Sequence, residues 1–242
     1  MGHHPDSSGQ DKTITEAEHA AAGRRFYLDM HSHSTDASGD AGGTVEGYLK
    51  WIVARRKRGY RIDGFVLTEH RQFDPSVNYD GIASQYRVTV LRGAELETDA
   101  GHVLVYGLTP AFTSQFDLRS VSLPFHDIRR AARETGGFAV PAHAGRPRIG
   151  VAEHVASGLT LDGVTVVEQL NGGSSDAENA LAAELTEEHG LHRVGGSDAH
   201  FVSAIGRCMT AFPEPITSVE QLVEELGAGD YYPVTVEETV EG

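Results

Sequence analysis

The sequence contains a single cysteine, Cys208, among its 242 residues, so no disulfide can form within the chain. This usage is typical of proteins in the reducing cytoplasm. Long apolar runs are also absent, since no stretch approaches the ~20 residues needed to cross a bilayer. The first 25 residues are polar and lack the apolar segment of a signal peptide. We therefore expect a cytoplasmic protein with no membrane partner.

Basic residues are scarce as well. The chain has 20 Lys and Arg against 35 Asp and Glu, which gives a formal net charge of −15 with histidine counted as neutral. A surface this acidic repels phosphate backbones, which predicts that no nucleic-acid polymer is a partner. Bound divalent cations would reverse the charge locally and attract a small phosphorylated substrate. Nothing in the sequence specifies an oligomeric state.

Strand-like apolar runs alternate with amphipathic stretches over residues 25–242, which predicts one α/β domain. Residues 1–24 are polar and are expected to form a flexible tail. The expected strands are Phe26–His31, Ile62–Thr68, Val88–Glu95, His102–Gly107, Phe138–His143, Gly163–Leu170 and Arg193–Gly196, followed by a β-rich end at Tyr231–Val236. The expected helices are Thr44–Arg58, Asp127–Thr135, Asp176–His189 and Ser218–Leu226. This alternation favours mainly parallel pairing of about seven strands, in an open doubly wound sheet or a closed barrel.

The unusual polar residues fall at the ends of these strands. His31 and His33 close the first strand, and residues two apart on a strand point the same way, so both imidazoles can reach one metal ion. Asp198 and His200 repeat this spacing after the last short strand. Three more strand ends and the start of another strand carry an acid or an imidazole, namely His70, Glu95, His143 and His102. Chance accounts for one or two such placements but not for all of them.

A cluster of imidazoles and carboxylates is costly to bury unless a metal satisfies it. Mixed nitrogen and oxygen ligands without cysteine suit Zn, Mn or Fe better than a lone Ca or Mg ion. Glu95 is the natural bridging ligand, because a carboxylate has two oxygens to share between two ions. We therefore expect two to three divalent metal ions at the carboxyl ends of the strands, where α/β barrels carry their active sites.

The ordered motifs resemble those of the PHP (polymerase and histidinol phosphatase) family. They read Asp-Met-His31-Ser-His33, Thr-Glu-His70, Gly-Ala-Glu95, Pro-Ala-His143 and Gly-Ser-Asp198-Ala-His200. The resemblance covers roughly residues 26–212 and implies a distorted (β/α)7 barrel with a trinuclear metal centre. It also implies three ligand sets: His31, His33, Glu95 and Asp198 for one ion; Glu95, His143 and His102 for a second; His70 and His200 for a third. For His102, a structural role as a hydrogen-bonded strand residue stays open.

The third set is the poorest in ligands. Family members commonly place an Asp or His five or six residues after the second histidine of His-x-His, and these positions here are Ser38 and Gly39. A neutral hydroxyl brings no charge to a divalent cation. Asp36 and Asp40 flank the gap, and either could reach in if the loop bends. We expect the third ion to be the weakest.

Arginines that follow the ligand motifs are candidates to bind a phosphate group. Arg207 comes shortly after the Asp198 motif, and Arg146 follows His143. A guanidinium group suits bidentate phosphate binding, although a surface salt bridge is the alternative for any one arginine. Glu168 ends a strand and is expected either to orient a ligand or to support one from behind. Histidines on helices or loops, such as His126, are taken as surface residues.

Together these features predict a metal-dependent hydrolase of small phosphate esters, either phosphomonoesters or small phosphodiesters. A metal-bridging hydroxide is the expected nucleophile, with Glu95 and Asp198 holding the ions and either His200 or a metal-bound water protonating the leaving oxygen. Two alternatives stay open. One is an amidohydrolase-like enzyme that acts on a non-phosphate substrate, which would be indicated by a carboxylated lysine at a strand end, and none is seen. The other is a catalytically silent metal-binding domain, which would be indicated by lost ligands.

Overall fold

The computed structural model describes residues 25–240, so the expected tail at residues 1–24 lies outside the described residues. The strands are β1 (Phe26–Ser32), β2 (Gly64–His70), β3 (Thr89–Thr98), β4 (Gly101–Tyr106), β5 (Phe138–Pro141), β6 (Val166–Asn171), β7 (His192–Gly196), β8 (Cys208–Phe212) and β9 (Tyr232–Thr235). The α-helices are α2 (Val45–Arg56), α3 (Asp80–Tyr86), α4 (Pro110–Thr113), α5 (Phe125–Glu134), α6 (Val151–Ala156), α7 (Asp176–His189) and α8 (Val219–Ala228). Two 3₁₀ turns, η1 (Val202–Ala204) and η2 (Val236–Thr239), flank β8 and β9.

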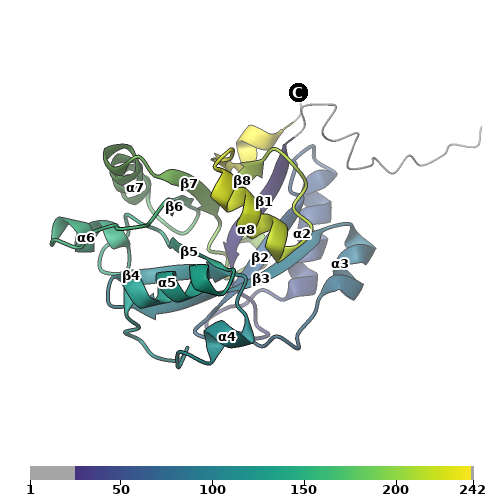
Figure 1. Cartoon of the computed structure of the whole chain (residues 1–242). Coiled ribbons are helices and arrows are strands. Elements are labelled where there is room, and N and C mark those ends of the chain that lie inside the picture. Colours follow the sequence, from purple (N-terminus) through teal and green to yellow (C-terminus); the bar gives the residue numbers. More distant parts are fainter. Residues whose placement is uncertain (1–24, 241–242) are drawn as a thin grey trace, which may run out of the picture.

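The strands form a distorted barrel rather than an open doubly wound sheet. Seven strands make one curled sheet in the order β5-β4-β3-β2-β1-β8-β9, and β6 pairs with β7 beside it. The two parts are tied at their strand ends, where Ala144 N donates to Glu168 O at 3.1 Å and Asp198 N donates to His31 O at 2.8 Å. Helices α2 and α3 cover one side and α6 and α7 the opposite side (Figure 1). The expected fold class, a distorted α/β barrel, is confirmed.

The expectation of mainly parallel pairing is wrong. Only the pairs β1–β2, β2–β3 and β6–β7 are parallel, whereas β1–β8, β3–β4, β4–β5 and β8–β9 are antiparallel. The connection between β3 and β4 has only Asp99 and Ala100. A parallel pair needs a crossover of a dozen or more residues, so this short link forces an antiparallel hairpin. The described residues also contain nine strands rather than about seven, because β9 forms in the expected β-rich end and β8 was not expected.

Alternation along β1 separates the apolar core from the polar strand ends. Leu28 and Met30 are buried in a cluster with Val66 and Leu104, while Asp29 and His31 point the other way. Helix α2 packs Tyr48 and its apolar side chains against the sheet in a second cluster. The Tyr48 hydroxyl donates to His33 O and, at 3.1 Å, to Ala199 O. The helix therefore ties the ends of β1 and β7 together where the candidate site lies.

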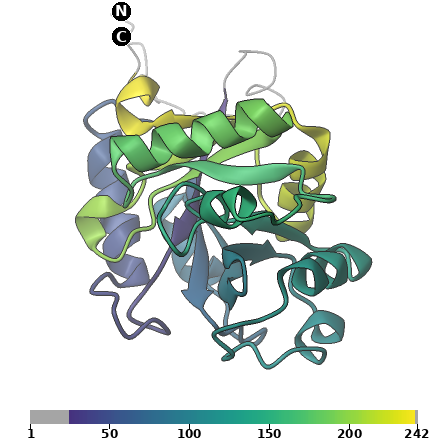
Figure 2. The same cartoon turned by 90° about the vertical axis from the view of Figure 1, so that its left-hand side faces the viewer.

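Helix α7 runs alongside β6 (Figure 2). Ser175 and Glu178 form a capping box at its amino end, and Gly190 with φ +64° ends it in the left-handed conformation. These signals explain why the helix has the bounds expected from the sequence. Among residues 25–240, no helix has the length and apolar character that a membrane crossing requires.

Candidate metal centre

The structure brings together all eight side chains proposed as metal ligands. His31 lies in β1 and His33 directly follows it, His70 ends β2, Glu95 lies in β3 and His102 in β4. The other three follow strand ends: His143 after β5, and Asp198 and His200 after β7. Within residues 25–240, these eight side chains form three groups of three, with His33 shared by two of them. The donor atoms in each group lie within 4.8 Å of one another: His31, His33 and Asp198; Glu95, His102 and His143; and His33, His70 and His200.

The first group has the spacing of a tetrahedral cage. The facing nitrogens His31 Nε2 and His33 Nε2 are 3.1 Å apart. Asp198 Oδ1 lies 3.5 Å from the first and 3.3 Å from the second, and Glu95 Oε2 lies 3.5 Å and 3.4 Å from them. Ligands about 2.0–2.1 Å from a tetrahedral ion are roughly 3.3–3.4 Å from each other. The donor set expected for the first ion therefore has the dimensions that such an ion requires.

The second group centres on the other oxygen of Glu95. Glu95 Oε1 lies 2.9 Å from His102 Nδ1 and 3.0 Å from His143 Nε2. His102 thus contacts the bridging carboxylate directly, which fits the ligand role and also the hydrogen-bonded role left open from the sequence. Glu95 faces one group of histidines with each of its two oxygens, as a bridging ligand does.

The third group includes a carboxylate that sequence reasoning left undecided. Asp40 Oδ2 lies 3.3 Å from His70 Nε2 and 3.4 Å from His200 Nε2, and the two nitrogens are 3.4 Å apart. Asp36 instead accepts a hydrogen bond from the Tyr79 hydroxyl. The loop therefore turns Asp40 toward the histidines and Asp36 away from them. The expected weakness of this site stays a prediction, although its donor set is richer than the sequence indicated.

The donor atoms at the centre of the cluster are suited to hold a cation. Glu95 Oε2 is buried and makes no hydrogen bond, although three imidazoles lie within 3.5 Å of it. Burial opposes a charge on His31, but the carboxylates of Glu168, Asp198 and Glu95 raise its pKa well above its usual range. Burial lowers the pKa of His33 to about 4, so His33 is neutral beside it. The surrounding carboxylates thus favour a positive charge at this place, which a divalent cation would also supply.

Glu168 supports two of the histidines from behind. Its carboxylate lies 3.1 Å from His31 Nδ1 and accepts from His143 N at 2.6 Å and from Asn171 Nδ2 at 3.0 Å. Because a carboxylate can only accept, His31 must carry its proton on Nδ1 and present Nε2 to the cluster when it is neutral. The structure therefore puts Glu168 in the supporting position that the sequence left as one of two options.

Two buried carboxylates escaped the sequence analysis. Asp29 accepts from Ser197 N and Gly206 N, both at 2.8 Å, and so ties β1 to the segment that carries Asp198. Burial raises the pKa of Asp29 to about 6. Glu69 accepts from the hydroxyls of Ser34 and Ser38 and holds the loop that carries Asp40. Asp29 and Glu69 could have been recognised in the sequence as charged residues within apolar strands.

Two candidate ligands sit on strained backbone. His143 has φ +32° and Asp198 has φ +52°, in the left-handed region that residues with side chains rarely adopt. Such conformations cost about 1–3 kcal/mol each and persist where the surroundings enforce them. Here the enforcing bonds are His143 N to Glu168 and Asp198 N to His31 O. The expected strand Phe138–His143 ends early, at Pro141, because His143 turns its side chain into the site.

The two arginines proposed for phosphate binding differ in their surroundings. All three nitrogens of the Arg146 guanidinium are engaged: Nη1 lies 3.0 Å from Asp198 Oδ2, Nη2 donates to Asn171 Oδ1 at 2.8 Å, and Nε donates to Ser174 Oγ at 3.2 Å. Arg207 is exposed and donates only to Gly172 O, at 3.3 Å. Arg146 therefore holds Asp198 in place, while Arg207 keeps most of its donors at the rim of the site.

Comparison with known proteins supports the fold. A sequence profile for the family described as PHP-associated matches residues 173–231. PsfC from Pseudomonas syringae PB-5123 gives a TM-score of 0.62 at 17% identity, over 89% of this chain and 93% of that one. A two-domain protein from Bacteroides vulgatus, described as containing a predicted PHP-like metal-dependent phosphoesterase, gives 0.55 at 19% identity, over 88% and 65%. No protein with a curated function matches the sequence.

A third structural neighbour corrects one expectation. Endonuclease Q in complex with a 27-mer duplex that carries an abasic lesion at the active site gives a TM-score of 0.58 at 16% identity, over 86% of this chain and 58% of that one. The expectation that no nucleic-acid polymer is a partner was therefore wrong, because a chain of this fold acts on DNA. The net charge of −15 averages over the whole molecule, whereas substrate binding depends on the local charge at the site.

Proposed function

We propose that this chain is a member of the PHP family and a hydrolase that cleaves phosphate esters with two to three bound divalent ions. One observation carries the proposal. The two oxygens of Glu95 face two different groups of histidines, and Asp198 completes the first group. The mixture of imidazole and carboxylate donors favours Zn, Mn or Fe. When bound, paired ions at such a site activate a water and stabilise the negative charge that develops on a phosphoryl group.

The protein residues orient this arrangement. Glu168 fixes the ring of His31, and Arg146 fixes the carboxylate of Asp198, so both ligands are held before any ion binds. Arg207, with free donors at the rim, is the better candidate to bind the phosphate of a substrate. Arg146 then acts as a positioning residue.

His200 is better suited to bind an ion than to protonate a leaving group. Its Nδ1 lies 3.0 Å from Asp198 O, and a carbonyl oxygen can only accept a hydrogen bond. Nδ1 must therefore carry the proton of the neutral ring. The remaining lone pair on Nε2 faces His70 and Asp40. This arrangement favours the ligand role over the acid role considered from the sequence.

The substrate class proposed from the sequence is a small phosphomonoester or phosphodiester, and the Endonuclease Q comparison adds phosphodiesters of DNA. We expect the chain, loaded with Zn, Mn or Fe, to hydrolyse at least one substrate in a panel of p-nitrophenyl phosphate, bis-p-nitrophenyl phosphate, nucleoside monophosphates and abasic DNA duplex. Activity should disappear with a chelator and return with metal. No hydrolysis of any substrate by protein with a full metal content would favour a catalytically silent metal-binding domain.

We predict that Asp40 holds the third ion. Replacing Asp40 by Asn removes its charge with little change in shape, and should lower the metal content after dialysis by about one ion per chain. Elemental analysis by mass spectrometry measures this directly. Asp36→Asn is the matched control, because Asp36 lies in the same loop but contacts Tyr79. Equal metal content in wild type and Asp40→Asn, or an equal loss in both variants, would contradict the assignment.

A further inference from the structure

A cavity lies away from the metal centre, between α5 and the segment that precedes β6. Its volume is about 410 Å³, within the range of roughly 300–1,000 Å³ typical of small-molecule sites. The wall of the cavity includes Phe138 and Ala139, which are the first two residues of β5, and Thr165, which directly precedes β6. The metal centre lies beyond the opposite ends of these strands. Strand β5 runs about 10 Å from Phe138 in the cavity wall to Pro141, and His143 follows beyond that end.

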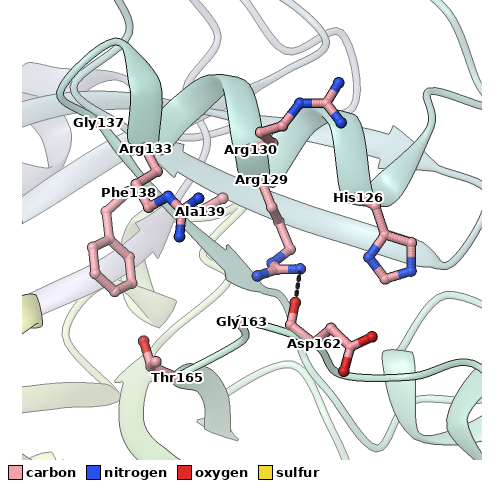
Figure 3. A pocket seen from close by; sticks show the side chains of 10 residues that line it. All are labelled: His126, Arg129, Arg130, Arg133, Gly137, Phe138, Ala139, Asp162, Gly163 and Thr165. Carbon is pink, nitrogen blue, oxygen red and sulfur yellow. Dashed lines mark hydrogen bonds between the residues drawn. The ribbon is translucent and has the colours of Figure 1, made fainter.

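The walls of this cavity are basic, in contrast to the acidic chain as a whole. Helix α5 contributes His126, Arg129, Arg130 and Arg133, and their spacing of three and four residues brings them to one side of the helix. Figure 3 shows the side chains of Arg129 and Arg133 reaching toward the space above Thr165, with the ring of Phe138 beside them. His126, expected at the surface from the sequence, is exposed and lines the same cavity.

Two of these arginines lack an acidic partner. Arg130 is already paired with Asp127 at 2.7 Å. Arg129 donates instead to the carbonyl oxygen of Asp162 at 2.7 Å, and no carboxylate among residues 25–240 lies within ion-pair distance of Arg129 or Arg133. Burial and the neighbouring charge of Arg133 lower the pKa of Arg129 below its usual range, although the nearby carboxylate of Asp162 opposes this shift. Within the described part of the chain, neither Arg129 nor Arg133 forms an ion pair with a carboxylate, so both guanidinium groups have N–H donors to offer an anion in the cavity.

The loop opposite α5 is shaped to leave room for the guanidinium. Gly163 has φ +70°, and a side chain there would come within 2.9 Å of Arg129 Nη2. Glycine therefore permits both the turn and the close approach of Arg129. The Phe138 ring, half-buried beside the arginines, offers an apolar face, and Thr165 offers a hydroxyl on the far wall.

From these features we infer that the cavity between α5 and the Asp162–Thr165 segment binds a nucleotide, with Arg129 and Arg133 on its phosphate and Phe138 against its base. Guanidinium groups bind phosphate oxygens through paired, charge-assisted hydrogen bonds. An aromatic face suits a flat heterocycle. This site is separate from the metal centre and does not depend on the proposed hydrolytic activity.

Isothermal titration calorimetry with AMP on the full chain tests the inference. The double variant Arg129→Gln/Arg133→Gln should weaken AMP binding at least about tenfold, because two charge-assisted contacts are lost. Arg130→Gln is the control, because it removes a positive charge from the same helix. Arg130 is already paired with Asp127, so this variant should leave AMP binding unchanged. Asp198→Ala, which damages only the metal centre, should also leave this binding event unchanged. If the double variant fails to fold, the single variant Arg133→Gln, at an exposed position, carries the test.

Three results would overturn the inference. AMP binding that is lost in Asp198→Ala but kept in the arginine variants would assign the nucleotide to the metal centre alone. No detectable binding at millimolar AMP would show that the cavity does not bind this nucleotide. Equal affinity for AMP and inorganic phosphate would reduce the cavity to a general anion site without recognition of a base.

Discussion

Replacing Glu95 by glutamine is expected to lower the rate of phosphate-ester hydrolysis by about a thousandfold or more. Glutamine keeps the shape of the side chain but exchanges one oxygen for an amide NH₂, which has no lone pair for a metal. Whichever way the amide points, one of the two histidine groups loses its shared ligand. The loss of an ion from a paired site removes both the activated water and the charge stabilisation. Steady-state kinetics with saturating metal measures the effect.

The control for this substitution is Glu184→Gln. Glu184 is exposed on α7, away from the candidate site, so the same chemical change should leave kcat and KM unaltered. Metal analysis of Glu95→Gln should also show fewer ions per chain than wild type. A Glu95→Gln variant with the rate and the metal content of wild type would remove the basis of the proposed mechanism.

Metal removal is expected to lower the melting temperature by roughly 10 °C. An ion that binds only the folded chain adds about 4 kcal/mol when its free concentration is a thousand times its Kd. In a chain of this size, each kcal/mol corresponds to roughly 2–4 °C. Without ions, Glu95 keeps a buried oxygen that makes no hydrogen bond, and the facing nitrogens of His31 and His33 must share a proton.

Differential scanning calorimetry on dialysed and reloaded protein measures the shift. Glu95→Gln serves as the internal control, because a variant that has lost bound ions should gain less from added metal. A wild-type melting temperature that does not change between chelator and excess Zn or Mn would mean that these side chains do not bind metal in the folded protein.

The position of the candidate site could be predicted from the sequence because its residues lie at strand ends. Once the strands were located, His31, His143 and Asp198 could be expected to lie together, since strand ends in an α/β barrel converge at one edge. Helix α7 was predicted with its bounds because Ser175, Glu178 and Gly190 are strong local signals. Local patterns of this kind do not depend on the rest of the fold.

Other parts of the fold depend on contacts that the sequence pattern does not carry. Strand β8 was missed, and its place between β1 and β9 depends on pairing with residues far away in the chain. The choice between Asp36 and Asp40 depends on how one loop bends, and that bend is held by Glu69 through Ser34 and Ser38. The orientation of Arg146 toward Asp198 likewise follows from Asn171 and Ser174, which lie on another strand end and loop.

The double engagement of Glu95 has a thermodynamic consequence for the filling of the sites. An ion held by Oε2 together with His31 and His33 would fix the torsion angles of the Glu95 side chain. Oε1 lies beside His102 and His143, so it would need no further ordering when a second ion binds there. Each of these two ions would then lower the entropy loss of the other on binding. We therefore expect the two sites that share Glu95 to fill together, ahead of the weaker third site.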